Sequence, residues 1–158
     1  MEEIIQLNSG AKLSPHFTLG EMTKSSSHPE VYNIPSHEAI ANLKRVCGWL
    51  EVLRKRYNEK YGVGEEPVRI NSGYRSPQLN RAIHGNANSN HMMGCAADIR
   101  VSGMEQALRY AVILMDYADE SKQEFDELLI EKNRYGAIWL HFAVRPANNR
   151  RKILFINA

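Results

Sequence analysis

Two histidines and an aspartate have the residue types of a metal site. His91 and Asp98 lie seven residues apart in a segment of small residues that includes Gly94, so the backbone between them can turn back on itself. His141 lies further along, in an apolar segment. A catalytic zinc ion takes three ligands from histidine, aspartate or glutamate and leaves a fourth position open to water. These three side chains meet that need if the fold brings them together.

Each of these side chains also has an ordinary structural explanation. His91 could cap a loop turn, Asp98 could be an acid at the end of a strand, and His141 could be a core or surface histidine. Spacing alone leaves both interpretations open, because a metal site depends on how the surrounding elements place its ligands.

The pattern of apolar and turn-forming residues predicts those elements. Apolar residues recur at helical spacing from Ile40 to Tyr57, after an N-cap at Ser36 and before Gly62. The other expected elements are an irregular segment at 1–35, a strand at 68–72, a short helix at 77–83, a loop at 85–94, a strand at 97–101, a helix opened by a capping box of Ser102 and Glu105, strands at 127–131 and 137–144 around a turn at 133–136, and a strand at 152–157. Early helices and late consecutive strands predict an α+β fold, with an antiparallel sheet and flanking helices in a single domain over 1–158.

Composition excludes several classes of protein. The chain has 158 residues, of which 43% are hydrophobic and 24% charged, as in ordinary globular domains. A formal charge of +2 without a concentrated basic patch argues against a nucleic-acid partner. No apolar run is long enough to cross a bilayer, so we expect no membrane partner.

Three motifs follow one another along the chain: Ser72-Gly73-Tyr74-Arg75, the segment from Ser89 to Asp98, and Trp139-Leu140-His141. Together they resemble the signature of the zinc D-alanyl-D-alanine carboxypeptidase family, which also includes D-alanyl-D-alanine dipeptidases and phage L-alanyl-D-glutamate endolysins. The early segment HFTLGEMTKSSSH is similar to the phage-type branch of that family. The resemblance implies a fold of the hedgehog and D,D-peptidase type.

The resemblance implies that His91, Asp98 and His141 hold one zinc ion. Zinc would polarise the scissile carbonyl of a peptidoglycan stem peptide and lower the pKa of the attacking water. Arg75 matches the family arginine that faces the substrate carbonyl, where its donors would stabilise the growing negative charge. The alternative for Arg75 is a surface salt bridge.

Two more motif residues, Tyr74 and Ser89, are expected on the substrate side of the site. Ser89 matches the serine of the central motif, which binds substrate or fixes the loop, and the sequence does not separate these two roles.

The general base is the part of the resemblance that does not transfer directly. In several relatives a carboxylate lies three residues before the last histidine, where this chain has Ile138. Glu131, at the end of the preceding strand, is predicted to take that role if the intervening turn closes a hairpin. Asp126 and Glu127 are further back and are expected to be solvated.

The expected function is therefore a zinc peptidase that cuts the stem peptide, as a D,D-carboxypeptidase or an endolysin-type endopeptidase. The alternative is a non-catalytic zinc-binding module that recognises wall peptide or a protein partner, and the position of Glu131 separates the two. The start, MEEIIQLNSG, has no signal-peptide pattern, so we expect a protein that is cytoplasmic as synthesised and acts on the wall after release. The bond that is cut and the oligomeric state stay open.

Overall fold

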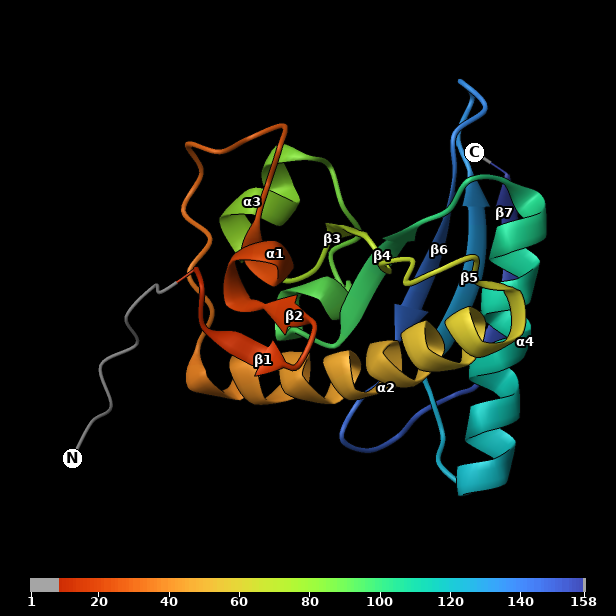
Figure 1. Ribbon diagram of the computed structural model, residues 1–158. Coiled ribbons are helices and arrows are strands. Elements are labelled where there is room, and N and C mark those ends of the chain that lie inside the picture. The colour runs from red at the N-terminus through yellow and green to blue at the C-terminus, as the bar shows by residue number, and fades with distance from the viewer. Residues whose placement is uncertain (1–8, 158) are drawn as a thin grey trace.

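A five-stranded sheet with two long helices on one face forms the body of the structure (Figure 1). The structure is a computed structural model, and it describes residues 9–157. The strand order is β3-β4-β6-β5-β7. The strands are β3 (Ile70–Ser72), β4 (Ala96–Arg100), β5 (Glu127–Lys132), β6 (Ile138–Ala143) and β7 (Lys152–Asn157). This architecture confirms the α+β fold predicted from the sequence.

The last strand departs from the expected antiparallel pairing. The pairs β3–β4, β4–β6 and β5–β6 are antiparallel, whereas β7 runs parallel to β5. The cause is the path of residues 144–151, which carry the chain past the start of β5 so that it returns on the far side of that strand. As a result β7 forms one edge of the sheet.

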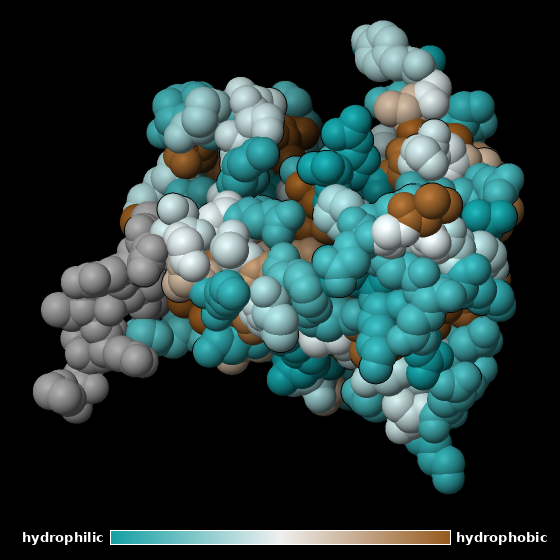
Figure 2. Space-filling model, viewed as in Figure 1, coloured by the Kyte–Doolittle hydropathy of each residue, from teal (hydrophilic) through white to brown (hydrophobic). Residues whose placement is uncertain are grey.

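The long helix α2 (His37–Tyr61) has the boundaries that the sequence predicts. The Ser36 side chain accepts a hydrogen bond from the backbone N–H of Ala39 and so caps the first turn. At the other end, the N–H of Gly62 donates to the carbonyl oxygen of Asn58. Figure 2 shows that the face of the molecule over α2 is mostly hydrophilic, as expected for a helix with one buried side.

The second long helix, α4 (Met104–Ser121), does not begin with the predicted capping box. Its N-cap is Gly103, which makes no side-chain cap hydrogen bond. The Glu105 carboxylate instead lies 2.6 Å from Nη2 of Arg109, and the backbone N–H of Ser102 donates to Oε1 of Gln106. The capping-box prediction was wrong because the helix begins one residue later than expected, at the N-cap Gly103, and the Glu105 carboxylate pairs with Arg109 instead of the backbone.

The first 35 residues contain more regular structure than expected. The chain forms two short strands, β1 (Lys12–Ser14) and β2 (Phe17–Thr18), and one turn of helix, α1 (Leu19–Thr23). Phe17 and Met22 are buried in the hydrophobic core, which fixes this segment on the body of the molecule. The expectation of an irregular segment was wrong over these elements, and its first eight residues lie outside the described part of the chain.

The hydrophobic core lies between the sheet and the helices α2 and α4. Leu128, Leu140 and Phe142 point from the sheet into this core and are almost fully buried. Because side chains alternate along a strand, the residues next to them point to the opposite face of the sheet. That opposite face carries Asp98 and His141. No helix in the described part of the chain is long and apolar enough to span a membrane.

Candidate metal centre

His91 is held in place by a short helix inside the segment that the sequence predicts as loop. This is a 3-10 helix, η1 (Asn90–Met93). The Ser89 side chain caps it by accepting a hydrogen bond from the His91 N–H. Gly94 ends it at a φ of 75°. A side chain at Gly94 would place its Cβ 2.4 Å from the carbonyl oxygen of Ala39 on α2, so glycine lets η1 pack closely against that helix.

The His91 ring is buried and its orientation is fixed. Nδ1 lies 2.6 Å from the carbonyl oxygen of Gly73, an atom that can only accept a hydrogen bond. Nδ1 therefore carries the proton when the ring is neutral, and Nε2 is left with a lone pair. Nε2 faces Asp98, with 3.2 Å between it and Oδ1.

Asp98 and His141 face each other across two central strands. They are directly paired residues of β4 and β6, and Nδ1 of His141 lies 2.9 Å from Oδ1 of Asp98. The ligand atoms of His91, Asp98 and His141 all lie within 4.8 Å of one another. Two imidazole nitrogens and a carboxylate oxygen at this separation fit the ligand set of a catalytic zinc ion.

The electrostatics of this cluster favour a positive charge. Burial alone would lower the pKa of His141, but hydrogen bonds and charge from Asp98 and Glu127 raise it to about 10. Burial likewise acts to raise the pKa of Asp98, and the two histidines overcome it and hold that pKa well below its usual range. The cluster therefore stabilises a cation between its carboxylates.

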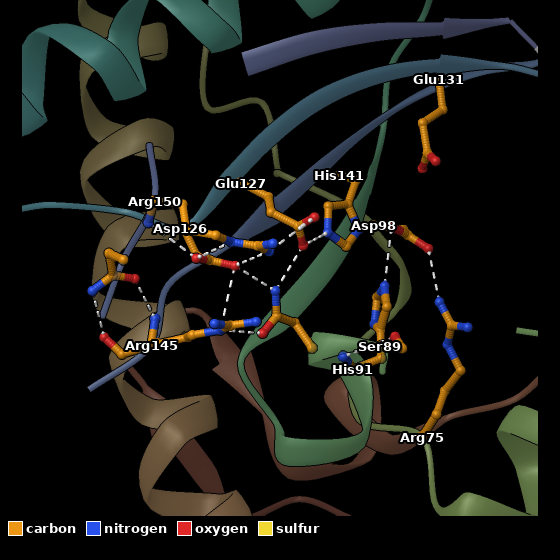
Figure 3. A network of polar contacts seen from close by, with 12 residues as sticks. Arg75, Ser89, His91, Asp98, Asp126, Glu127, Glu131, His141, Arg145 and Arg150 are labelled. Carbon is orange, nitrogen blue, oxygen red and sulfur yellow. Dashed lines mark hydrogen bonds and ion pairs between the residues drawn. The ribbon is translucent and has the colours of Figure 1, made fainter. Parts of the chain in front are cut away.

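Arg75 follows β3 and lies beside the three candidate ligands (Figure 3). Its Nη2 is 3.5 Å from Oδ2 of Asp98, and its Nη1 donates to Oδ1 of Asn80 at 3.2 Å. Its Nε is buried and has no hydrogen-bond partner among the described residues. Burial lowers the pKa of this guanidinium. A buried hydrogen-bond donor without a partner lowers the stability of the fold, and an oxygen atom of a bound ligand could supply the missing acceptor.

Glu131 lies in the same cleft as the three candidate ligands. It is directly paired with Trp139, two residues before His141 on the adjacent strand, so all three share one face of the sheet. Its Oε2 accepts a hydrogen bond from Nε1 of Trp139 at 2.7 Å. Burial, together with the negative charge of Asp98, raises the pKa of Glu131. A carboxylate with a raised pKa is a better proton acceptor, as general-base catalysis requires.

The cleft itself has a volume of about 500 Å³. Its lining includes Arg75 and Ser89 together with residues of the sheet. Ser89 thus both caps η1 and lines the cleft. Tyr74 does not line it, because its side chain is buried in the hydrophobic core and is only 7% exposed. The expected contact between Tyr74 and substrate stays a prediction, and the burial of its side chain does not favour it.

The expectation that Asp126 and Glu127 are solvated was wrong for Asp126, which is buried, and Glu127 is partly buried in the lining of the cleft. Asp126 is completely buried, and Arg150 donates to it through Nε and Nη2. Glu127 Oε1 lies 3.1 Å from Nε2 of His141. The alternation of β5 could have indicated this, since Glu127 and Glu131 are four residues apart and point to the same face.

These distances fit a three-ligand metal centre with an arginine and a carboxylate beside it, on an α+β fold. Comparison with known proteins assigns the family. The model of the peptidase M15 family matches residues 15–125, a range that includes His91 and Asp98 and ends before β5. The chain belongs to the peptidase M15 family.

The chain is also similar to the zinc D-Ala-D-Ala carboxypeptidase of Streptomyces albus G. The two are 29% identical over 97 residues, which are 61% of this chain and 36% of that relative. The family resemblance seen in the sequence is confirmed, and the cluster of His91, Asp98 and His141 agrees with the expectation of one zinc ion. The assignment to a phage-type branch stays a prediction.

Proposed function

We propose that this protein is a zinc peptidase that hydrolyses the stem peptide of peptidoglycan, with His91, Asp98 and His141 as the metal ligands. The observation that carries the proposal is that these ligands share one cleft with Arg75 and Glu131. The family match and the zinc carboxypeptidase relative support the substrate class.

The residues of the cleft divide the work of peptide hydrolysis. A bound zinc ion supplies Lewis-acid polarisation of the scissile carbonyl and a water of lowered pKa. Glu131 accepts a proton from the attacking water and returns it to the leaving amine. Arg75 donates to the carbonyl oxygen of the substrate as negative charge develops on that oxygen. The oxygen then serves as an acceptor for the N–H groups of the Arg75 guanidinium, whose Nε–H has no partner among the described residues.

The position of Glu131 favours a peptidase over a non-catalytic binding module. A module that only binds wall peptide needs no proton acceptor beside its metal ligands. Glu131 lines the cleft, and its pKa is raised by burial and by Asp98. Both features fit a base more closely than they fit a purely structural partner of Trp139.

The test combines metal content with product analysis. Purified wild-type protein and its His91→Ala variant would be analysed for zinc and incubated with purified peptidoglycan, and the released products identified by mass spectrometry. His28→Ala is the matched control, since the hydrogen bonds of His28 with described residues are local, to Ser25, Ser27 and Val31.

We expect about one zinc per chain and product release in the wild type and the control, and loss of both in His91→Ala. Free D-alanine would identify a D,D-carboxypeptidase. New peptide termini within the stem peptide would identify an endolysin-type endopeptidase. Zinc without product from any type of peptidoglycan would point to the binding module. Wild-type protein that takes up no zinc when it is supplied would refute the metal site.

A further inference from the structure

The two histidines of the candidate metal centre present different ring nitrogens to Asp98. His91 turns Nε2 toward it, because Nδ1 is bound to the carbonyl oxygen of Gly73. His141 turns Nδ1 toward it and points Nε2 at Oε1 of Glu127. A neutral imidazole has one N–H and one lone pair, so the group that accepts the N–H decides which nitrogen can bind a cation.

We infer that Glu127 is a positioning residue, which holds the proton of His141 on Nε2 so that Nδ1 is the atom offered to the metal. The inference rests on the proposed metal site and adds a role for a residue outside the ligand set. Glu127 does for His141 what the carbonyl of Gly73 does for His91. Partners of this kind fix both the proton position and the ring orientation of metal-binding histidines.

Glu127 can do this because it is itself held on its other side. Nδ2 of Asn90 donates to Oε1 of Glu127 at 2.6 Å and to Oδ2 of Asp126 at 2.8 Å. Nε of Arg145 donates to the side-chain oxygen Oδ1 of Asn90 at 2.8 Å. This bond orients the side-chain amide so that its NH₂ group faces both carboxylates. Asn90 is 3% exposed and Asp126 is fully buried.

Arg150 completes this network from the loop before β7. Its Nε and Nη2 donate to the two oxygens of Asp126 at 3.0 and 2.8 Å, and its Nη2 lies 3.6 Å from Oε2 of Glu127 (Figure 3). Two arginines therefore offset the charge of two neighbouring carboxylates. The network connects the start of β5 with η1, the element that carries His91.

The test compares two variants of Glu127, one that removes the acceptor oxygen and one that keeps an acceptor oxygen but removes the negative charge. In Glu127→Ala no oxygen is left to accept the Nε2–H of His141, whereas in Glu127→Gln the amide carbonyl still can. Glu120→Gln is the matched control, since Glu120 pairs with Arg56 on the surface of the helices. Zinc affinity is measured by competition with a chelator of known affinity. The bound nitrogens are identified from ¹¹³Cd–¹⁵N couplings in cadmium-loaded protein with labelled histidines.

We expect wild-type protein to bind metal through Nδ1 of His141 and Nε2 of His91. Glu127→Ala should lose about 10–100-fold in zinc affinity, the range typical for partners of metal-binding histidines. Glu127→Gln should keep most of the affinity, and Glu120→Gln all of it. Because the couplings are measured in wild type and in Glu127→Gln, the inference is tested even if Glu127→Ala does not fold.

Binding through Nε2 of His141, or unchanged affinity in Glu127→Ala, would overturn the inference and leave the proposed metal site standing. Absence of metal binding in the wild type would overturn both. Binding through Nδ1 with the expected loss in Glu127→Ala, but without peptidoglycan hydrolysis, would support the inference and overturn the peptidase.

Discussion

Replacing Glu131 with glutamine should abolish most hydrolysis while leaving the fold and the metal site intact. Oε2 of Glu131 accepts a hydrogen bond from Nε1 of Trp139 at 2.7 Å. The carbonyl oxygen of glutamine can accept the same bond, so stability should change by less than about 1 kcal/mol. A glutamine amide, however, cannot take a proton from water.

The size of the effect follows from what else lies in the cleft. Loss of a general base typically costs about 10²–10⁴-fold in rate, or roughly 3–5 kcal/mol at 1.36 kcal/mol per tenfold. The other two carboxylates lining the cleft are already engaged, Asp98 by the histidines and Glu127 by His141 and Asn90. Because neither can replace the base, we expect kcat to fall by about 10³–10⁴-fold.

The assay is the initial rate of product release from purified peptidoglycan, normalised to zinc content. Trp139→Phe is the matched control, because it removes the hydrogen bond and leaves the carboxylate. It should lower kcat by less than about tenfold, since one hydrogen bond contributes about 1 kcal/mol. If Glu131→Gln kept more than about a tenth of wild-type kcat with full zinc content, Glu131 would not be the base.

Three further changes test other parts of the structure. Arg75→Gln should lower kcat by about 10²–10³-fold with zinc retained, as for loss of one oxyanion donor, and unchanged kcat would exclude that role. In metal-free protein the pKa of His141 is about 10, above the ordinary value of 6.5. Its protonation therefore stabilises the fold fully below pH 6.5, and this contribution is lost as the pH rises through 10. Thermal unfolding should show a melting temperature that falls between pH 6.5 and 8.5, with a shallower slope in His141→Gln. Gly94→Ala should cost more than about 1 kcal/mol in denaturant unfolding, because φ is positive and Ala39 lies against it. Gly136→Ala, at a similar φ of 87° with open space, should cost less.

The parts of the fold that could be predicted from sequence are those fixed by local signals. The helix α2 has an N-cap at Ser36, a stop at Gly62 and regular apolar spacing between them. The candidate ligands His91, Asp98 and His141 could be proposed from the sequence because each lies in a recognisable motif, and the structure brings them within 4.8 Å of one another. The pairing of β4 with β6 brings Asp98 and His141 together, whereas His91 is placed by η1, a short helix that the sequence predicts as loop.

The parts that could not be predicted depend on contacts between distant segments. Asp126 is buried because Arg150, from the loop before β7, and Asn90, from η1, both donate to it. No local pattern distinguishes such an acid from a solvated one. Tyr74 belongs to a motif, but the sequence does not show in which direction its ring points. In the structure the ring is buried in the hydrophobic core. The direction of β7 likewise depends on the path of a loop.

The direct pairing of Asp98 with His141 ties metal binding to correct folding. The two residues are 43 positions apart in the chain and meet only through the register of β4 and β6. A slip of one residue between these strands would turn His141 into the hydrophobic core, because neighbouring side chains point to opposite faces. A chain with misaligned central strands therefore has no metal site. During refolding, binding of the ion therefore indicates that β4 and β6 are paired in the native register. Because the ion binds only in that register, it also stabilises the native register relative to other registers.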